Sequence, residues 1–425
     1  MVLSGTNNRF IILIIIAGAL LIRIGVFSYF TVKGYEPQMY EYDDIALNLA
    51  EGEGFLNVYM GAEFYSCTTP LYPFICALFF KLFGLLNHTP IMLFQIIVSS
   101  CTCLILFYLG RKLSGDPAGI IAAGLYAVHP GFIIYSTAKL HPLVLDSFLF
   151  LLTLAAFIGL VGKTRMRDYL LTGMLVGLCM LSRSTVIAFV PIGLIWIMVL
   201  KKSPLKKLIS CFSVLFAGIL IIVLPWSVRN YIVHGQFIFI TSTDAEVFWR
   251  GNNINASGSS HMDGRKMVLE GDKSFSFMIP HFGETEKRYI FRERTGYFLR
   301  DHTCLAVLLF FKKLYYFWWF SPTVGVQYPK GYVIPYRLFY IALLVSAILG
   351  MRVILKTGNM SQVENFVMLL LFVLSVSFFQ SMFYVEGRHR WGIEPMLMLL
   401  SGTGIVYLIR SIITGRGDKE AMVCS

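Results

Sequence analysis

Charged residues are scarce in this chain. Of its 425 residues, 14% are charged and 56% are hydrophobic, and the mean hydropathy is +0.69. This balance excludes an ordinary soluble domain, in which about a quarter of the residues are charged. In place of charge the sequence has a series of apolar runs, each close to the ~20 residues that cross a bilayer as a helix. We therefore predict an all-α polytopic membrane protein.

Metal-ligand spacing is also lacking. The eight cysteines show none of the paired spacings that hold zinc, and most lie in apolar runs where a small buried side chain explains them. Cys67 and Cys304, both in predicted outer loops, could form a disulfide. The sequence requires no metal or other cofactor, although it leaves a bound divalent ion open.

A cleavable leader is not apparent either. The opening stretch "NNRFIILIIIAGALLIRIGVF" has no small-residue cleavage site after a short apolar core, which predicts an uncleaved first span. The net charge of +12 could suggest nucleic acid, but Lys and Arg fall mainly in short clusters between apolar runs. That pattern is typical of membrane topology, so we predict no nucleic-acid partner.

The apolar runs predict about ten spans, with nine to eleven as the range. They cover residues 10–30, 90–109, 118–135, 142–161, 169–182, 185–200, 208–224, 336–351, 366–384 and 393–409. The basic clusters between them then share one side, which the positive-inside rule makes cytoplasmic. Counting residues 304–320 as a further span would put the C-terminal basic residues outside. We predict that this segment, and also the short 70–84, lies in the outer interface.

This topology sorts the loops by side. The cytoplasmic connections are short and basic, whereas the outer face receives the long loops 31–89 and 225–335 and the turn "VEGRHRWG". We expect these loops to pack on the spans, so that residues 1–425 form a single integral membrane domain. Nearly every unusual polar cluster then faces outward.

An acidic cluster opens the first outer loop, in "MYEYDDIALNLAEGEGF". At helical spacing Glu41 and Asp44 share a face while Asp43 points elsewhere. A partly buried carboxylate near the membrane surface could act as a general base for an acceptor hydroxyl or amine. Taken alone, the cluster favours a solvated acidic cap on a short helix, the commoner role for acids in a first turn.

The turn "VEGRHRWG" concentrates positive charge on the face where topology disfavours it. Its Arg388, Arg390 and His389 predict an anionic ligand, because guanidinium groups pair bidentately with phosphate and Glu386 could orient one of them. Arg183 lies where two short apolar segments meet, so it requires a polar setting and is a second candidate for a phosphate.

Three further outer stretches carry candidates. In "HPGFIIYSTAKLHPLVLD" the candidates for an anionic or sugar ligand are Lys139, His141 and Tyr135, with snorkelling as the alternative for the lysine. The turn "LPWSVRNYIVHG" adds Arg229 and Asn230, which an interfacial anchor would also explain. In "FWRGNN" Arg250 and Asn252 could bind sugar hydroxyls, although a turn-rich loop needs asparagine anyway.

Taken in order, six stretches resemble the GT-C class of membrane glycosyltransferases, in particular the bacterial branch similar to protein mannosyltransferases and the lipid A aminoarabinose transferase. They are "IALNLAEGEGF" with the acids before it, "TPLYPFICALFFKLFG", "GMLVGLCMLSRS", "LPWSVRNYIVHGQF", "WRGNN" and "EGRHRWGIEP". The resemblance implies a sugar donor carried on a polyprenyl or dolichyl phosphate, transfer on the outer side of the membrane, and inversion at the anomeric carbon.

The resemblance also implies roles for residues. An acid of the first outer loop acts as base in the family, which here leaves Glu41, Asp43 and Asp44 within reach, because the family's Asp-Glu pair does not appear as such. The family's phosphate-binding arginines would correspond to Arg388 and Arg390, with Arg183 or Arg229 as further candidates. The large C-terminal domain of some relatives does not follow "IEPMLML", so the acceptor stays open among a glycan, a lipid and a protein.

The sequence thus predicts an inverting glycosyltransferase of the bacterial inner membrane, with its site on the extracytoplasmic face and the polyprenyl-phosphate-linked sugar and membrane lipid as partners. Two alternatives stay open: a flippase or transporter of a lipid-linked saccharide, and a polymerase or ligase that uses a diphosphate-linked oligosaccharide. The first is disfavoured because the charges cluster on one face and no internal duplication is visible.

Overall fold

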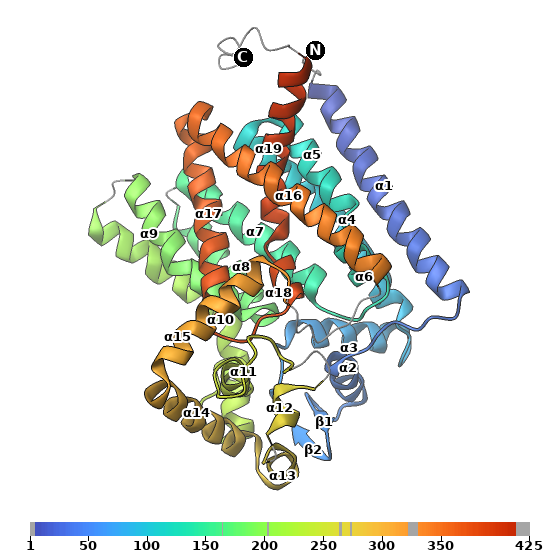
Figure 1. The fold of residues 1–425 in the computed structure, drawn as a ribbon, viewed down its shortest axis with the longest axis vertical. Helices are drawn as coiled ribbons and strands as arrows, with labels where there is room; N and C mark the ends of the chain where they lie inside the picture. The colour runs from blue at the N-terminus through green and yellow to red at the C-terminus, as the bar shows by residue number, and fades with distance from the viewer. Residues whose placement is uncertain are drawn as a thin grey trace.

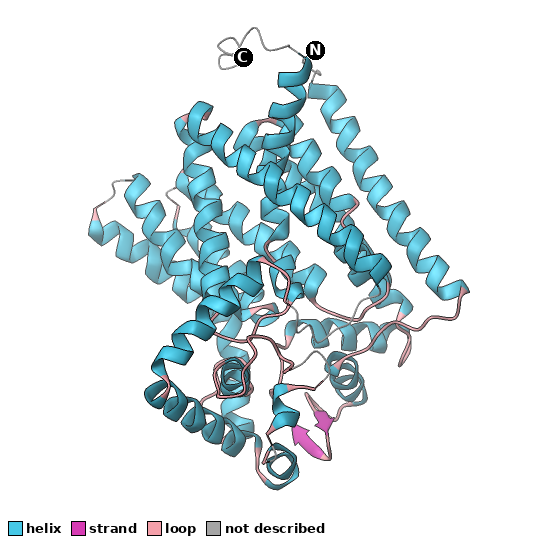
Figure 2. Cartoon of the chain, in the orientation of Figure 1, coloured by secondary structure: helices cyan, strands magenta, loops and turns pink. Residues whose placement is uncertain are grey.

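The computed structural model describes residues 5–163, 165–201, 204–262, 266–272, 274–321 and 330–413. Its first helix, α1 (Gly5–Val32), begins at the end of the molecule where the last helix, α19 (Glu394–Ile413), finishes. The elements of both long loops gather at the opposite end (Figure 1). Among the described residues, all regular secondary structure is helical except for two short strands (Figure 2).

A bundle of helices of different lengths makes up the upper part of the molecule in Figure 1. Besides α1 and α19 they are α4 (Thr89–Ser114), α5 (Asp116–Ala127), α6 (Pro130–Thr137), α7 (Leu143–Val161), α8 (Met166–Ser182), α9 (Phe189–Lys201), α10 (Leu205–His234), α16 (Lys330–Thr357) and α17 (Met360–Gln380). Seven described helices are long and apolar enough to cross a membrane, or eight if the bent pair α5 and α6 is one span. The chain is therefore an integral membrane protein.

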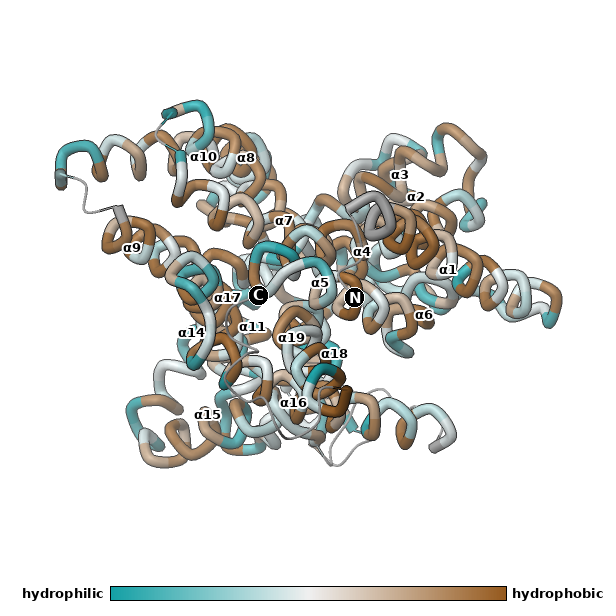
Figure 3. The backbone as a smooth tube through the Cα atoms, turned by 90° about the horizontal axis from the view of Figure 1, so that it is seen from above, coloured by the Kyte–Doolittle hydropathy of each residue, from teal (hydrophilic) through white to brown (hydrophobic). Residues whose placement is uncertain are grey.

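The predicted count of about ten spans is not confirmed. Predicted spans 169–182 and 185–200 correspond to α8, which has 17 residues, and to a short apolar segment formed by the 3₁₀ turn η1 (Ser184–Ala188) and α9. Both are short because the polar stretch around Arg183 interrupts the apolar run, and the helical backbone breaks there. Hydrophobic residues predominate along helices such as α1 and α9 (Figure 3), and exposed apolar side chains such as Leu21 and Ile195 suit contact with lipid.

The break between α5 and α6 has a local cause. Pro130 cannot donate to the preceding turn, and His129 caps α6 by accepting a hydrogen bond at Nδ1 from the Phe132 amide, at 3.2 Å. The carbonyl groups freed at the end of α5 are satisfied by Arg23, a fully buried side chain of α1. Its Nη1 donates to the Ala127 carbonyl at 3.0 Å. The buried charge of Arg23 is thus stabilised by backbone carbonyl groups that have no partner within their own helix.

Small residues allow the helices to pack closely. A Cβ atom on Gly173 of α8 would lie 2.0 Å from the Leu215 carbonyl oxygen of α10, and one on Gly350 of α16 would lie 1.9 Å from the Leu400 carbonyl oxygen of α19. Such contacts bring helix backbones together where lipid supplies little hydrophobic driving force.

The outer end is built from both long loops and one short turn. The first loop contributes α2 (Glu41–Glu51), β1 (Asn57–Tyr59), β2 (Ala62–Phe64) and α3 (Leu71–Phe83), and the second α11 (Asp244–Gly251), α12 (Val268–Gly271), α13 (Phe275–His281), α14 (Glu284–Asp301) and α15 (Thr303–Trp318). The short turn carries α18 (Gly387–Trp391). Neither α3 nor α15 qualifies as a span by length and composition, and their interfacial position stays a prediction.

Two details complete the outer end. Strands β1 and β2 pair antiparallel around Met60 and Gly61, whose φ values of 52° and 77° suit a two-residue hairpin turn. Besides the main core, the second loop has a small hydrophobic cluster centred on Trp249 and Phe291. Cys67 and Cys304 are both free, so the predicted disulfide does not form.

Candidate functional site

The three acids of the first outer loop have different surroundings. All lie in the first turn of α2, but Asp43 is buried and lies 2.8 Å from His88 Nε2, while Glu41 and Asp44 are exposed. Partial burial and the neighbouring Asp43 raise the pKa of Asp44. The charge of Glu41 instead acts on Tyr40 and Tyr42, on which Arg388 also acts. Glu41 therefore lies between two tyrosines on which the basic turn also acts, and the choice between Glu41 and Asp44 as the base stays a prediction.

Arg388 is the centre of the basic turn. Its Nε lies 3.0 Å from Glu386 Oε2, and its side chain is 23% exposed. Glu386 is itself fixed, because Ser260 Oγ of the second outer loop donates to its other oxygen. Burial lowers the pKa of Arg388, but Glu386 and the surrounding tyrosines outweigh that effect and hold it well above its usual value. Arg388 is therefore a permanent cation whose direction Glu386 controls.

Arg183 approaches the same place from α8. Its Nη2 donates to Gln380 Oε1 at 3.3 Å, and its Nη1 lies 3.9 Å from Asp146 Oδ2. Burial lowers the pKa of His389 well below its usual value, and the charges of Arg183 and Arg388 add to this effect. Two guanidinium groups from different helices therefore flank one neutral imidazole.

His141 lies inside a box of tyrosines. The ring centroids of Tyr40, Tyr42 and Tyr135 are 5.4, 5.8 and 5.2 Å from that of His141, all edge to face. Burial and the nearby cations hold the pKa of His141 well below its usual range, so the ring is neutral. Its Nδ1 accepts from the Leu143 amide at 3.1 Å, which leaves the proton on Nε2.

Lys139 borders this box. Its Nζ lies 4.8 Å from the ring centroid of Tyr135. Burial, reinforced by the charge of Arg388, lowers the pKa of Lys139 to about 8. We call the set Tyr40, Glu41, Tyr135, Lys139, His141, Arg183, Glu386, Arg388 and His389 the outer polar cluster.

Several buried atoms around this cluster have no hydrogen-bond partner among the described residues. They are the Tyr40 hydroxyl, Asp146 Oδ2 and Arg250 Nε. A buried polar atom without a partner costs about 1–3 kcal/mol, so such atoms tend to mark sites where a ligand supplies the missing bond. Asp146 was missed in the sequence analysis, although a single carboxylate in the apolar run of α7 was a detectable signal.

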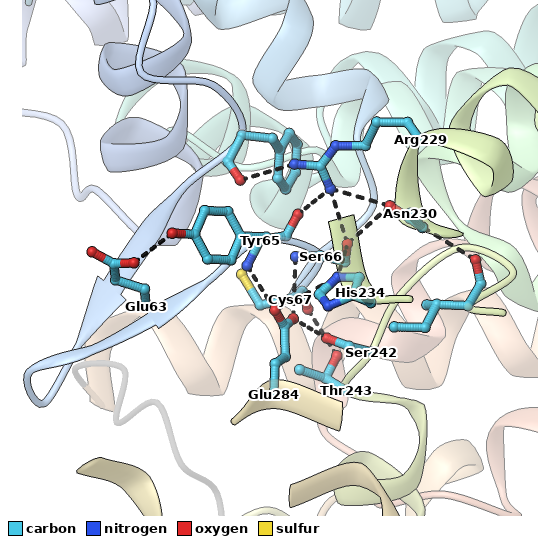
Figure 4. Close-up of polar contacts among 12 residues, drawn as sticks. Glu63, Tyr65, Ser66, Cys67, Arg229, Asn230, His234, Ser242, Thr243 and Glu284 are labelled. Atoms are coloured by element: carbon cyan, nitrogen blue, oxygen red, sulfur yellow. Dashed lines mark hydrogen bonds and ion pairs between the residues drawn. The ribbon is translucent and has the colours of Figure 1, made fainter. Parts of the chain in front are cut away.

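Arg229 and Asn230 belong to a different group, drawn in Figure 4. Arg229 Nη1 donates to Ser66 Oγ at 3.1 Å and also to the Tyr65 carbonyl, and Ser66 Oγ in turn donates to Asn230 Oδ1 at 2.9 Å. Glu284 accepts from the amides of Tyr65 and Ser66 at 2.7 and 3.1 Å.

His234 and Ser242 complete this group. We call Ser66, Arg229, Asn230, His234, Ser242 and Glu284 the outer-loop latch, because they join both long loops to the end of α10. The structure thus directs Arg229 and Asn230 to bonds within the protein.

Arg390 also lies apart from Arg388. It is fully buried, and its Nε lies 2.6 Å from Glu394 Oε1 while its Nη2 donates to the Tyr336 hydroxyl at 2.7 Å. Glu394 also lies 2.7 Å from His129 Nε2. Arg390 is therefore part of a closed network between spans, because its neighbours already use its hydrogen-bonding groups.

Arg250 in α11 and Asn252 at its end, both predicted to bind sugar, have different surroundings. Arg250 pairs with Glu246 and lies over the ring of Tyr384, 5.0 Å from its centroid. The charge of Glu386 also acts on it, so it borders the outer polar cluster. Asn252 instead accepts from Lys313 Nζ at 2.9 Å and donates to the Met382 carbonyl at 2.8 Å, which makes it a structural link. No group of three or more potential metal ligands is found among the described residues.

The chain resembles known proteins in part of its sequence and in its fold. Residues 68–228 match the family model of the dolichyl-phosphate-mannose-protein mannosyltransferases. No curated protein sequence matches the chain.

Solved structures match over most of this chain. The crystal structure of the Archaeoglobus fulgidus oligosaccharyltransferase in the apo form has a TM-score of 0.61 at 14% identity, covering 99% of this chain and 53% of that one. AglB from the same organism, in complex with an inhibitory peptide and a dolichol-phosphate, gives 0.55 at 14%, covering 96% and 52%.

ArnT from Cupriavidus metallidurans, bound to undecaprenyl phosphate, gives a TM-score of 0.54 at 11% identity, covering 93% of this chain and 60% of that one. The chain thus spans about half to three-fifths of the length of the structures it matches. At these identities the likeness is one of fold.

Proposed function

We propose, on the premise that this chain is a membrane protein of the GT-C fold, that it is an inverting glycosyltransferase that takes a sugar from a polyprenyl-phosphate donor and passes it to an extracytoplasmic acceptor. The observation that carries the proposal is that α2, whose first turn bears the exposed Glu41, packs on His141 through Tyr40 and Tyr42, while Arg388 and Arg183 bring positive charge to the same imidazole. This combination suits a reaction in which a hydroxyl loses a proton while a phosphate leaves.

The donor chemistry is supported by the cations. The leaving group of a polyprenyl-phosphate sugar is a lipid phosphate, on which negative charge develops as the glycosidic bond breaks. Guanidinium groups held by Glu386 and Gln380 are positioned before that charge forms, so they stabilise the transition state with little reorganisation. Relatives in fold bind lipid phosphates of this class, undecaprenyl phosphate in one case and dolichol-phosphate in another.

The base is assigned to Glu41. The acceptor oxygen attacks the anomeric carbon from the face opposite the phosphate, the C–O bond to phosphate breaks, and the acceptor proton passes to the Glu41 carboxylate. The products are the glycosylated acceptor and the polyprenyl phosphate, with inverted configuration. Asp43 is less suitable because His88 occupies it, and Asp44 because its charged neighbour is another carboxylate.

The location of the site supports a lipid donor. Such donors are poorly soluble in water and enter from the bilayer, and the outer polar cluster lies where the spans meet the interfacial helices of the loops. We assign this face to the extracytoplasmic side of a bacterial inner membrane, because the short basic loops mark the other face as cytoplasmic.

The test is a comparison of Glu41→Gln with Asp44→Asn. Each variant is assayed in membranes for transfer of radiolabel from a panel of synthetic undecaprenyl-phosphate monosaccharides. We expect Glu41→Gln to lose about 10²–10⁴-fold in kcat, the range for a general base, and Asp44→Asn to stay within about three-fold of the unmodified chain.

Full activity in Glu41→Gln would refute the base assignment. A separate measurement addresses the reaction class, namely mass spectrometry of lipid copurified with the chain. A polyprenyl monophosphate carrying one sugar supports the proposal, whereas a diphosphate-linked oligosaccharide supports a polymerase or ligase in its place.

A further inference from the structure

A second site candidate lies in the large outer loop, away from the outer polar cluster. A cavity of about 400 Å³ opens among α11, α12 and α14 and the turn after α11. We call it the outer-loop pocket. Its volume is enough for one or two sugar rings, and it falls in the size range of small-molecule sites.

The walls of the pocket combine aromatic and polar groups. Trp249 and Phe298 are almost completely buried and form its inner wall, whereas Tyr297 on the same side of α14 is 49% exposed. Aromatic faces of this kind pack against the C–H faces of sugar rings, as they do against other rigid apolar surfaces.

The polar groups lie around the aromatic wall. Arg294 Nη1 is 2.7 Å from Asp272 Oδ2, and Asp301, which pairs with Arg300 at 2.9 Å, lies in the lining together with Asn253, Asn255 and His302. These planar side chains offer neighbouring donors and acceptors, which match the paired hydroxyl groups of a saccharide. Because Arg294 is already paired with a carboxylate, the pocket has no surplus of cations and is unsuited to a phosphate or another polyanion.

Helix α11 connects this pocket with the outer polar cluster. Trp249 faces the pocket, while the next residue, Arg250, lies over Tyr384 beside the cluster. The helix end is fixed against the turn after α17: a Cβ on Gly251 would lie 2.6 Å from the backbone of Phe383, and Lys313 Nζ donates to the Gly251 carbonyl at 3.0 Å. A ligand in the pocket is therefore held at a set position relative to the cluster.

We propose that the outer-loop pocket binds a neutral saccharide unit of the acceptor. This inference rests on the proposed function, since it makes a glycan the acceptor class, and it adds a site that positions the acceptor while its reactive hydroxyl reaches the cluster. The lack of surplus positive charge and the aromatic wall favour a saccharide over a peptide, which would require satisfied backbone donors and acceptors along its length.

The experiment measures binding without requiring transfer. Full-length chain in lipid nanodiscs is titrated with methyl α-mannoside, methyl β-glucoside, methyl β-galactoside and methyl β-N-acetylglucosaminide, followed by saturation-transfer NMR. Tyr297→Ala and Asp301→Ala are compared with Tyr289→Ala, a matched change at an exposed tyrosine of α14 outside the pocket.

We expect at least one glycoside to bind, with about ten-fold weaker affinity in Tyr297→Ala and in Asp301→Ala and unchanged affinity in Tyr289→Ala. Equal binding by all three variants, or no binding of any glycoside by the unmodified chain, overturns the proposal. Displacement of the bound glycoside by an unglycosylated peptide would also overturn it. Retained glycoside binding in Glu41→Gln, alongside lost transfer, separates this pocket from the catalytic assignment.

Discussion

The outer polar cluster and the outer-loop latch have similar side chains, but they differ in how many of their hydrogen-bonding groups have a partner within the protein. Both combine arginine, glutamate and histidine with hydroxyl groups at the outer end of the spans. In the latch, Arg229 and Glu284 each have several partners within the protein. Around the cluster, Tyr40, Asp146 and Arg250 each keep a buried atom without a hydrogen bond among the described residues. Residue type alone therefore does not distinguish a binding site from a structural joint; the unmet hydrogen bonds do.

Arg388→Ala should have the largest effect on activity. It removes the cation assigned to the leaving phosphate, and we expect kcat/KM to fall by about 10²–10³-fold, as for loss of one preorganised donor. Arg388→Lys keeps a charge beside Glu386, and so protects folding, but loses the planar fork; an intermediate fall is expected. Transfer of labelled sugar is the measurement.

The matched change in the latch is Arg229→Ala. It should lower the melting temperature, because Ser66 and the Tyr65 carbonyl lose a donor, while activity per folded molecule stays near that of the unmodified chain. A loss of activity without loss of stability in this variant would erase the contrast between the two groups.

Glu284→Gln tests the latch directly. The amide retains one acceptor oxygen where the carboxylate offers two, so one of the Tyr65 and Ser66 amides or the Ser242 hydroxyl loses its partner. We expect the free energy of unfolding to fall by about 1–3 kcal/mol, measured by thermal or denaturant unfolding in detergent. Glu293→Gln, an exposed change on the same helix, should alter it by no more than about 0.5 kcal/mol.

Tyr40→Phe tests the unpartnered atoms of the cluster. Removing a buried hydroxyl that has no partner should leave stability unchanged or slightly higher. If the hydroxyl bonds the donor, KM for the donor rises by about five-fold, equal to the ~1 kcal/mol of one hydrogen bond. Tyr65→Phe, at a half-buried tyrosine whose hydroxyl donates to Glu63, is the control. An unchanged KM in Tyr40→Phe would remove Tyr40 from the site.

The sequence predicted the fold class well, because its signals are local. Long apolar runs and the distribution of basic residues suffice to predict a polytopic membrane protein. The resemblance of six stretches to the GT-C class supplied the rest, and the solved structures confirm that fold. The number of spans was harder to predict. The short apolar segment beside Arg183 has the same sequence pattern whether its helix crosses the membrane or breaks within it. The outcome depends on the neighbouring helices in the bundle.

The candidate residues depended on contacts that sequence does not record. Arg388 and Arg390 are two positions apart in one motif, yet Arg388 is partly exposed beside Glu386 and Arg390 is closed in a network with Glu394. Helical spacing placed Glu41 and Asp44 on one face, but could not reveal that the charge of Asp43 acts on Asp44, or that Glu41 and Arg388 both act on Tyr42. The carboxylate of Asp146 was visible in the apolar run, but its partner was not, because Ser182 lies in another helix.

The pH dependence of Lys139 gives the smallest expected effect. Burial lowers its pKa to about 8, so it loses its charge as pH rises through 8 in the folded chain, while in the unfolded chain the charge persists to about 10.5. The unfolded state then binds more protons between these values, and the free energy of unfolding rises with pH in that window. If Lys139 attracts the donor phosphate, KM for the donor should rise a few-fold over the same range. Lys139→Met should flatten both profiles, whereas a pH-dependent KM that persists in Lys139→Met would assign the titration to another group and leave Lys139 as part of the tyrosine box only.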